Sequence, residues 1–279
     1  MRVEAWLKQA TQELETGGIS TARLDCLVLL EDLTGKDRAY LLAHPEFPVK
    51  GSTFHKLEKQ IEKRKKHVPL AQIRGKTEFY GREFIINQDV LEPRPESETM
   101  IELLSDVYRV APCNGGKECT VVDVGTGSGA IGITAKLEIP EVEVIMTDID
   151  PACLTVARQN AKKHKVQVEI LQGNLLDALP SSTFHILPSI ILANLPYVPD
   201  SYEINQAALN EPKIAIFGGP DGLDLYRKMY SQLTKLKDKP TFILTESLPF
   251  QHKKLAQIAR QASYKQIGSE DFIQLFGLG

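Results

Sequence analysis

Cysteine is scarce in this sequence, and long apolar runs are absent. Cys26, Cys113, Cys119 and Cys153 form no Cys-x-x-Cys pair, and no histidine stands beside them at metal-ligand spacing. We therefore expect reduced, mostly buried thiols, a cytoplasmic protein and no metal site. No segment reaches the ~18 uninterrupted apolar residues that a membrane helix needs. The first residues also lack the apolar centre of a signal peptide, so no membrane association is expected.

A strong excess of either charge is also absent. The 279 residues carry a formal net charge of −3, and 42% of them are hydrophobic, as in an ordinary globular protein. Such a balance gives no general attraction to nucleic acid or to an anionic membrane. The charge is uneven, however, because nine Lys or Arg and only Glu58 and Glu62 lie between Lys50 and Lys76. This basic stretch is either a solvated helix face, the simpler interpretation, or a docking face for an anionic partner.

The first 75 residues predict a small helical domain. Apolar side chains recur at helical spacing, and three helices are expected. Gly17-Gly18 ends the first helix, and Ser20 and Ser52 are expected to cap the second and third. Leu24 is assigned to the apolar side of the second helix. No catalytic constellation occurs here, so this domain is expected to serve recognition or packing.

Residues 76–90 predict a β-hairpin linker, because "TEFYGREFIINQ" alternates around Gly81. Strands and helices then alternate through the third expected domain, residues 91–279. The expected strands are "CTVVDV", "VEVIMTD", "VQVEIL", "SIILAN", "TFILTES" and "FIQLF". Such strands, rich in Val and Ile and joined by helices, indicate an α/β fold with a mainly parallel sheet covered on both faces.

A glycine loop, "DVGTGSGAIG", follows the first of these strands. Gly125, Gly127 and Gly129 lie between a strand and a helix, at the carboxyl edge where open α/β sheets bind ligands. Glycine permits a tight turn and lets a ligand lie against the backbone. The loop therefore predicts a cofactor that carries a nucleoside. It does not distinguish a dinucleotide from S-adenosylmethionine, since the run also fits the loose dinucleotide pattern.

The next two strand ends add candidates for contact with the nucleoside. Asp148 ends the second strand, where a carboxylate can accept hydrogen bonds from both ribose hydroxyls. Asp150, directly before Pro151, is assigned to the cap of the following helix. After the third strand, Asn174 can form a hydrogen bond with the base, and Leu175 can pack on its ring. The alternative is that both are ordinary loop residues.

The fourth strand leaves the sheet through "NLPY". Asn194 offers a side-chain oxygen and Leu195 a backbone carbonyl, so two acceptors converge in the crevice of the glycine loop. Pro196 stiffens the turn, and Tyr197 offers a flat face for stacking. Together these groups predict a receptor for a planar NH₂ group. The simpler alternative is an Asn-initiated turn followed by a core tyrosine.

Such a receptor suits methyl transfer to an amide or exocyclic amine. An amide nitrogen is a weak nucleophile, because its lone pair is delocalised into the carbonyl group. Two hydrogen bonds from its N–H groups orient the nitrogen and stabilise positive charge as it develops. Hydride transfer needs no such receptor, and no hydride-transfer acid stands beside the loop, so an NAD-dependent oxidoreductase is disfavoured.

The sequence resembles the class I S-adenosylmethionine-dependent methyltransferases, and within them the HemK/PrmC family. The resemblance covers nearly the whole chain and is carried by "TEFYGREF", "PRPESE", "DVGTGSG", "NLPY" and "NEPKIAIFGGPDGLDLYR". Members of this family are protein-(glutamine-N5) methyltransferases that modify peptide chain release factors. The resemblance implies a seven-stranded, Rossmann-like methyltransferase domain behind the small helical domain. It also implies S-adenosyl-L-methionine as the methyl donor.

The resemblance also implies the roles of individual residues. The residues implied in donor binding are Gly125, Thr126, Gly127, Ser128, Gly129, Asp148, Leu175 and Asn194. The residues implied in holding the substrate glutamine are Asn194, Leu195, Pro196 and Tyr197, with Asn194, Pro196 and Tyr197 as the catalytic set. The substrate is the glutamine of the Gly-Gly-Gln motif in a class 1 release factor. Arg94 and Glu96 either line the entrance or form a structural ion pair.

Two positions depart from the family pattern, and two rival functions remain. Leu195 stands where the family usually has proline, and Leu175 where it often has an aromatic residue. An adenine-N6 methyltransferase acting on rRNA or DNA would use the same NH₂ receptor, but few cations flank Asn194. A non-catalytic module that binds release factors or ribosomes is the other rival. We expect a monomer without direct nucleic-acid contact.

Overall fold

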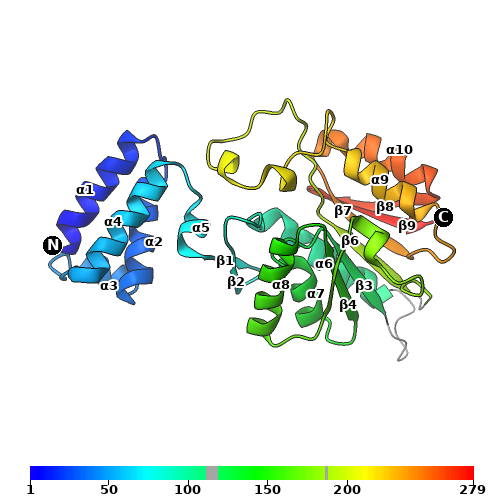
Figure 1. The fold of residues 1–279 in the computed structure, drawn as a ribbon, viewed down its shortest axis with the longest axis horizontal. Helices are drawn as coiled ribbons and strands as arrows, with labels where there is room; N and C mark the ends of the chain where they lie inside the picture. The colour runs from blue at the N-terminus through cyan, green and yellow to red at the C-terminus, as the bar shows by residue number, and fades with distance from the viewer. Residues whose placement is uncertain (111–118, 186–187) are drawn as a thin grey trace. The chain divides into compact units, whose positions relative to one another are not determined.

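The computed structural model describes residues 1–110, 119–185 and 188–279, so Cys113 lies outside the described residues. The chain divides into two compact units (Figure 1). One comprises Met1–Lys76 and Ile204–Asn210, and the other comprises Thr77–Glu203 and Glu211–Gly279. The inclusion of residues 204–210 in the first unit was not anticipated. The three sequence-based domain limits remain a prediction.

The first unit is helical. Its elements are α1 (Val3–Thr16), α2 (Ala22–Thr34), α3 (Arg38–Ala43), α4 (Gly51–Lys65), α5 (Leu70–Arg74) and the 3₁₀ helix η3 (Ala208–Asn210). The apolar sides of α1, α2 and α4 form one core around the buried Trp6, whose indole N–H donates to Glu58 at 3.0 Å. Arg64 and Asp25 form a buried ion pair in this unit at 2.7 Å.

Several local predictions for the helical unit are wrong. Thr21 and Lys50 occupy the N-cap positions of α2 and α4, and neither Ser20 nor Ser52 caps a helix. Leu24 is 47% exposed, because the buried side of α2 runs through residues 22, 25, 26, 29 and 30. The short helices α3 and α5 were missed, since five or six residues are too few to show a helical period.

The basic stretch is partly neutralised inside its own unit. Arg64 pairs with Asp25, and Lys65 pairs with Glu13 and Glu62. Arg74 and Lys76 both reach Asp32, at 2.6 and 3.4 Å. These pairs give part of the stretch a structural role and favour the simpler of its two interpretations.

The second unit begins with the predicted hairpin, β1 (Lys76–Phe79) and β2 (Arg82–Ile85). Tyr80 and Gly81 form its turn with φ of +52° and +68°, as a two-residue hairpin turn of this hand requires. Phe79 and Phe84 are buried members of a core cluster of this unit, so the hairpin belongs to that core. The Asn160 amide bonds both backbone groups of Ile85 at 2.7 and 2.8 Å.

A seven-stranded sheet forms the centre of the second unit, with the order β5-β4-β3-β6-β7-β9-β8 (Figure 1). Strands β3 to β7 run parallel, and β9 and β8 are antiparallel to their neighbours. The strands are β3 (Thr120–Val124), β4 (Glu143–Asp148), β5 (Glu169–Gln172), β6 (Ser189–Ala193), β7 (Phe242–Glu246), β8 (Tyr264–Glu270) and β9 (Ile273–Leu278). This sheet confirms the predicted α/β class and its mainly parallel arrangement.

Helices cover both faces of the sheet. One core joins the sheet to α6 (Glu98–Val110), α7 (Ala130–Glu138) and α8 (Pro151–His164). The other joins it to α9 (Asp224–Leu233), α10 (His252–Gln261) and the 3₁₀ helix η2 (Leu175–Ala178). The apolar residues of β3 and β6 are divided between the two cores, which explains why both strands are buried along their whole length and mostly apolar. Three further 3₁₀ helices are η1 (Pro95–Ser97), η4 (Lys213–Ala215) and η5 (Pro249–Gln251).

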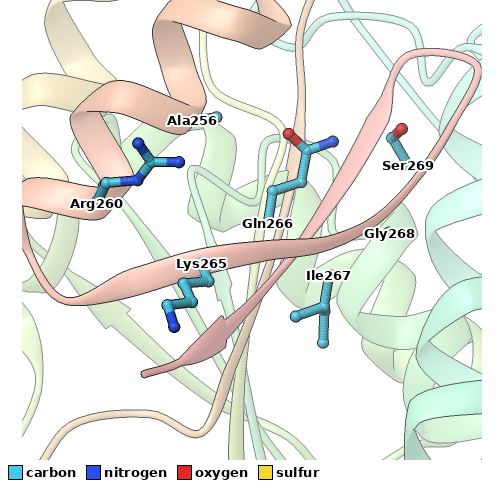
Figure 2. Close-up of a pocket in the computed structure, with 7 residues that line it drawn as sticks. All are labelled: Ala256, Arg260, Lys265, Gln266, Ile267, Gly268 and Ser269. Atoms are coloured by element: carbon cyan, nitrogen blue, oxygen red, sulfur yellow. The ribbon is translucent and has the colours of Figure 1, made fainter.

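Strand β8 was not anticipated as a separate strand. It lies at the edge of the sheet, and only Tyr264 of its seven residues is buried. A depression lined by Ala256, Arg260 and residues 265–269 lies between β8 and α10 (Figure 2). It contains none of the candidate site residues, which lie at the carboxyl ends of the parallel strands.

Candidate active site

The buried carboxylate of Asp123 holds the glycine loop in place. Asp123 accepts hydrogen bonds from the Thr126 hydroxyl at 2.5 Å and from the Gly132 N–H at 2.9 Å. Gly125, Gly127 and Gly129 all have positive φ, which explains the alternating glycines. Burial raises the pKa of Asp123 to about 6, although both hydrogen bonds oppose the shift.

Asp148 both supports the loop and lines the cavity beside it. One carboxylate oxygen accepts from the Gly127 N–H and the other from the Asp150 N–H, both at 2.9 Å. Burial raises the pKa of Asp148. Asp150 caps α8 through the Ala152 N–H at 2.8 Å, and Pro151 occupies the first turn, so both predictions about this helix start are confirmed.

The cavity lies at the carboxyl ends of the parallel strands, where a ligand of an open α/β sheet is expected. The candidate residues that line it are Gly125, Gly127, Asp148, Asn174, Leu175, Asn194, Leu195 and Pro196. The other lining residues are Asp89, Leu91, Ile149, Asp150, Cys153, Gly173, Pro212, Ile214, Ala215, Leu225 and Lys228. The candidates Thr126, Ser128, Gly129 and Tyr197 are not part of the lining. Thr126 and Ser128 instead hold the loop through Asp123 and Asn160.

Leu175 stands in the cavity wall with φ of +58°, an uncommon conformation for a branched side chain. Gln232 of α9 fixes this segment from both sides. Its amide nitrogen donates to the Asn174 carbonyl at 3.1 Å, and its oxygen accepts from the Leu176 N–H at 3.2 Å. These hydrogen bonds therefore hold Leu175 at the cavity although its positive φ is unfavourable for this residue type.

The Asn194 side chain is oriented by two residues that sequence reasoning missed. Its amide nitrogen donates to the Ser97 hydroxyl at 2.9 Å and to the Glu246 carboxylate at 3.0 Å. No hydrogen bond to its amide oxygen occurs among the described residues, and Asn194 lines the cavity. Its oxygen is therefore the atom left for a ligand, in agreement with an acceptor role.

Glu246 could have been found from strand order. Thr245 of β7 lies opposite Ala193 of β6, so Glu246 and Asn194 follow at the same level on neighbouring strands. A carboxylate at the end of a buried strand, next to a strand that ends in a candidate amide, indicates a partner for that amide. Ser97 offers no comparable signal, since it arrives from a segment almost one hundred residues earlier.

Tyr197 contacts other residues of the protein through both its hydroxyl and its ring. Its hydroxyl donates to Glu246 at 2.9 Å, and its half-buried ring packs against the core shared with α9 and α10. Burial and the neighbouring Glu246 raise the pKa of this phenol far above its usual value. The ring does not line the cavity, so its stacking on a substrate remains a prediction.

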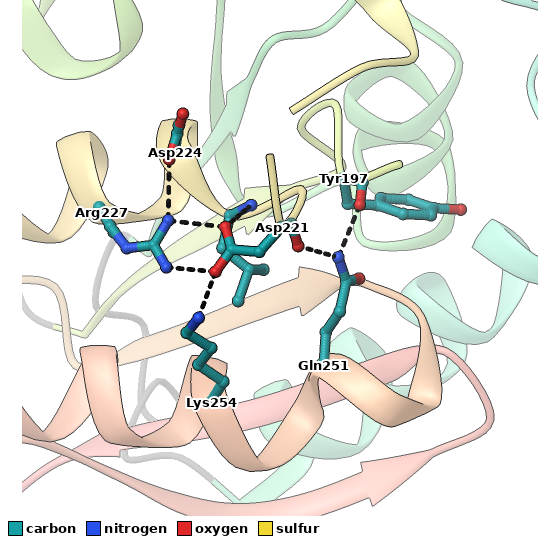
Figure 3. A network of polar contacts seen from close by, with 7 residues as sticks. Tyr197, Asp221, Asp224, Arg227, Gln251 and Lys254 are labelled. Carbon is teal, nitrogen blue, oxygen red and sulfur yellow. Dashed lines mark hydrogen bonds and ion pairs between the residues drawn. The ribbon is translucent and has the colours of Figure 1, made fainter. Parts of the chain in front are cut away.

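A polar network supports the turn that follows Tyr197 (Figure 3). The Gln251 amide nitrogen donates to the carbonyls of Tyr197 and Asp221, at 2.7 and 2.8 Å. The Asp221 carboxylate pairs with Arg227 and Lys254, each at 2.5 Å. Gln251 therefore links the "NLPY" turn to the Gly-Pro-Asp-Gly loop.

The glycines of that loop are required by close backbone packing. A Cβ atom at Gly222 would lie 1.9 Å from the Tyr197 carbonyl oxygen, and one at Gly218 would lie 2.2 Å from the Pro196 oxygen. Neither distance is possible for a real side chain, so the two loops pack without intervening atoms. Leu195 also contacts the glycine loop, where its side chain would meet a Cβ at Gly125 at 3.0 Å.

Arg94 forms an ion pair, but not with Glu96. Its guanidinium donates to the buried carboxylate of Glu211, which also accepts from the Glu92 N–H at 3.1 Å. Burial raises the pKa of Glu211, while the Arg94 charge opposes that shift. The pair joins the Pro-Arg-Pro segment to the "NEP" segment and has a structural role.

Metal and membrane features are not found in the described part of the chain. No group of three or more His, Cys, Asp or Glu residues in residues 1–110, 119–185 and 188–279 is placed to hold a metal ion. Cys26, Cys119 and Cys153 are buried, and none of the three forms a disulfide within the described residues. Within the same ranges, no helix combines the length and apolar character needed to span a bilayer.

Two family models match the chain. The PrmC N-terminal domain matches residues 5–75, and the methyltransferase small domain matches residues 102–210. The release factor glutamine methyltransferase of Bacillus subtilis (strain 168) is 35% identical over 243 residues, covering 86% of this chain and 83% of that protein. A bifunctional methyltransferase of Rickettsia bellii (strain RML369-C) is 32% identical over 269 residues. The match covers 87% of this chain and 48% of that relative, so the chain spans about half its length.

The fold is also found among solved structures. The hMettl16 catalytic domain, in complex with the MAT2A 3'UTR hairpin 6, aligns with a TM-score of 0.52 at 13% identity. The alignment covers 69% of this chain and 73% of that chain, and it shows likeness of fold. The sheet, the glycine loop and the methyltransferase small domain together define an enzyme of the class I methyltransferases, whose general methyl donor is S-adenosylmethionine. Within that class, the chain belongs to the release factor glutamine methyltransferase family.

Proposed function

We propose that this protein transfers a methyl group from S-adenosylmethionine to the side-chain amide nitrogen of a release-factor glutamine. The glutamine is that of the Gly-Gly-Gln motif in a class 1 peptide chain release factor. The observation that carries the proposal is the Asn194 amide, whose nitrogen is bonded inside the protein while its oxygen is left for the cavity. The family of the chain supports the same reaction, through relatives named for it.

The residues present fit the methyl donor. Gly125 and Gly127 line the cavity without side chains, and no atom lies within 4 Å of a Cβ built on Gly127. Asp148 offers carboxylate oxygens at the rim for ribose hydroxyls, and Asn174 and Leu175 stand where a base can be held. When bound, S-adenosylmethionine supplies a methyl group on a positively charged sulfur.

The chain itself orients the acceptor nitrogen. The Asn194 oxygen and the Leu195 carbonyl accept the two N–H groups of the substrate amide, aim its nitrogen and stabilise positive charge on it. Tyr226 fixes this turn, because its hydroxyl accepts from the Leu195 N–H at 3.3 Å and lies 3.1 Å from the Ala193 carbonyl. Pro196 stiffens the turn, because its ring restricts the backbone directly after Leu195. The proton released after transfer passes to water.

Mass spectrometry of a release factor treated with this protein and methyl donor tests the proposal. We expect a gain of one methyl group on the Gly-Gly-Gln glutamine. Asn194→Ala should reduce the rate about 100-fold or more, as the loss of one hydrogen bond to a developing charge does in other enzymes. A release factor with alanine in place of that glutamine is the matched control. Methyl transfer to RNA or DNA in the same assay, with none to the release factor, contradicts the proposal.

The rival nucleic-acid substrate finds little support in the charges around the site. Arg227, one of the nearest cations, is already paired with Asp221 and Asp224. Lys228 lines the cavity and is a single charge. A nucleic-acid methyltransferase needs several phosphate-binding cations around its cleft.

The helical unit and the location of the protein complete the proposal. We propose that residues 1–75 recognise the release factor, since the matching model is the N-terminal domain of this family. A release-factor substrate would place the enzyme in the cytoplasm, where translation takes place. We expect it to act as a monomer.

A further inference from the structure

A carboxylate without a cation lies beneath the candidate substrate turn. Glu246 is 1% exposed and accepts hydrogen bonds from Ser97 at 2.6 Å, Tyr197 at 2.9 Å and Asn194 at 3.0 Å. Within the described residues, no Lys, Arg or His forms an ion pair with it. These four residues form the amide cluster, which joins η1 to the ends of β6 and β7.

A buried anion of this kind is costly for the fold. Removing a carboxylate from water without a cationic partner carries a large penalty, which hydrogen bonds only partly offset. Burial accordingly raises the pKa of Glu246. Glutamine has the same shape and would avoid the buried charge. A group that opposes stability and is bonded to a cavity-lining residue is a candidate for a functional role.

The role follows from the symmetry of the neighbouring amide. The two ends of the Asn194 side chain have the same shape, so steric packing cannot distinguish the oxygen from the nitrogen. A serine hydroxyl cannot distinguish them alone, because it can either donate or accept. Ser97 donates its only hydrogen to Glu246 and is thereby left as an acceptor toward Asn194.

We propose that Glu246 is a positioning residue that fixes the direction of the Asn194 amide. A flipped amide would place its oxygen about 3 Å from a carboxylate oxygen, acceptor against acceptor, which hydrogen bonding forbids. The same carboxylate holds the Tyr197 hydroxyl, so both ends of the "NLPY" turn depend on one group. The inference rests on the proposed function, because it concerns the receptor for the glutamine NH₂ group.

Glu246→Gln tests the inference. The new amide can donate to Asn194 and turn it, which presents N–H groups to the cavity in place of oxygen. We expect methylation of the Gly-Gly-Gln glutamine to fall at least about 10-fold, while donor affinity stays within about twofold. The variant should also bind a Gly-Gly-Glu peptide better, relative to a Gly-Gly-Gln peptide, than the unchanged protein does. Unchanged peptide preference overturns the inference.

A double variant provides the sharper test. In Glu246→Gln with Asn194→Asp, the glutamine can donate to one oxygen of the new carboxylate, and the other oxygen faces the cavity. The acceptor is restored and the net charge equals that of the unchanged protein. We expect the double variant to bind the Gly-Gly-Gln peptide better than Glu246→Gln alone. A double variant that binds it no better than the single variant contradicts a role in amide direction. Should the single variant not fold, comparison with Asn194→Asp replaces it, and we again expect tighter binding by the double variant.

Thr245→Val is the matched control. Thr245 is buried beside Glu246, and its hydroxyl has no hydrogen-bond partner among the described residues. Valine keeps its shape, so peptide preference and rate should remain unchanged.

These experiments also separate the proposed function from the inference about Glu246. If the unchanged protein does not methylate the release factor, the proposed function fails. If the unchanged protein methylates the release factor and Glu246→Gln behaves in the same way, only the inference about Glu246 fails.

Discussion

Asp123 organises the glycine loop without lining the cavity. Its two hydrogen bonds, from Thr126 and Gly132, end on the same carboxylate oxygen. A single amide oxygen can accept both of them. The negative charge is therefore not required by this geometry, while its burial opposes folding. The pH dependence of stability can measure that cost.

We predict that Asp123→Asn stabilises the protein above pH 6. The folded-state pKa of Asp123 is raised from 3.8 to about 6, so on acidification the folded protein takes up this proton before the unfolded chain does. Its contribution to the free energy of unfolding therefore rises as the pH falls through that window and is lowest at neutral pH. The shift corresponds to about 3 kcal/mol at most.

Thermal unfolding of both proteins between pH 4 and pH 8 checks this prediction. We expect the difference between them to be largest near neutral pH and to shrink toward pH 4. A difference that does not vary with pH would mean that Asp123 is not the titrating group.

Single residues differ in how much the sequence reveals about them. Asn194 and Asp148 could be predicted, because each ends an apolar strand with a polar group at the binding edge of the sheet. Ser97 could not, because its partner Glu246 lies 149 residues away and the pairing depends on the tertiary fold. The hydrogen bond of the Tyr197 hydroxyl to Glu246 depends on the tertiary fold in the same way, and the stacking of its ring on a substrate stays a prediction.

Among the elements, the loop from Gly218 to Gly222 determines where the substrate turn can lie. Its backbone packs directly on the carbonyls of Pro196 and Tyr197. Gln251 holds the loop through a hydrogen bond to the Asp221 carbonyl (Figure 3). The loop and the "NLPY" turn should therefore move together.

Gly222→Ala should disrupt this packing. The added Cβ would lie 1.9 Å from the Tyr197 oxygen, and the backbone at Gly222 has φ of +77°. We expect a loss of stability of about 2 kcal/mol or more, and a fall in methylation that exceeds the loss of folded protein. Chemical denaturation and the methylation rate measure the two effects separately.

Gly268→Ala supplies the control for that prediction. Its Cβ would lie 3.7 Å from Leu275, an ordinary contact, on the edge strand β8. Stability and methylation should change little. Equal effects of the two substitutions would contradict the direct packing of the two loops.

The accuracy of element prediction follows the strength of the hydrophobic pattern. Strands β3 and β6 were predictable because every residue in each is buried. Helix α8 was predictable because Asp150 and Pro151 mark its start. Strand β8 was missed because Lys265, Gln266 and Glu270 face solvent, which removes the apolar signal. The caps at Ser20 and Ser52 were wrong because residue type alone does not fix the N-cap position.

At the scale of the whole molecule, charge is divided between structural pairs and free surface. Lys56, Lys59 and Lys63 lie exposed on α4, whereas Arg64 is buried against Asp25. If the exposed lysines form only a solvated face, they contribute little to binding. If they form a docking face, their removal weakens attraction to an acidic partner.

We predict that replacing Lys56, Lys59 and Lys63 together by glutamine leaves the KM for a release factor within about twofold. Exposed side chains that serve only as a solvated face make no contact whose loss would alter binding. Steady-state methylation at low and moderate salt measures the effect. A several-fold rise in KM that disappears at high salt would establish the docking face instead.

The central claim is that the Asn194 oxygen and the Leu195 carbonyl hold the substrate amide in the cavity. Its most direct test is a crystal structure of the protein with S-adenosylhomocysteine and a Gly-Gly-Gln peptide. We predict that the glutamine nitrogen lies about 3 Å from both oxygens, with the Asn194 nitrogen still bonded to Glu246. A glutamine bound outside the cavity, or an Asn194 amide with its oxygen turned inward, would contradict the account.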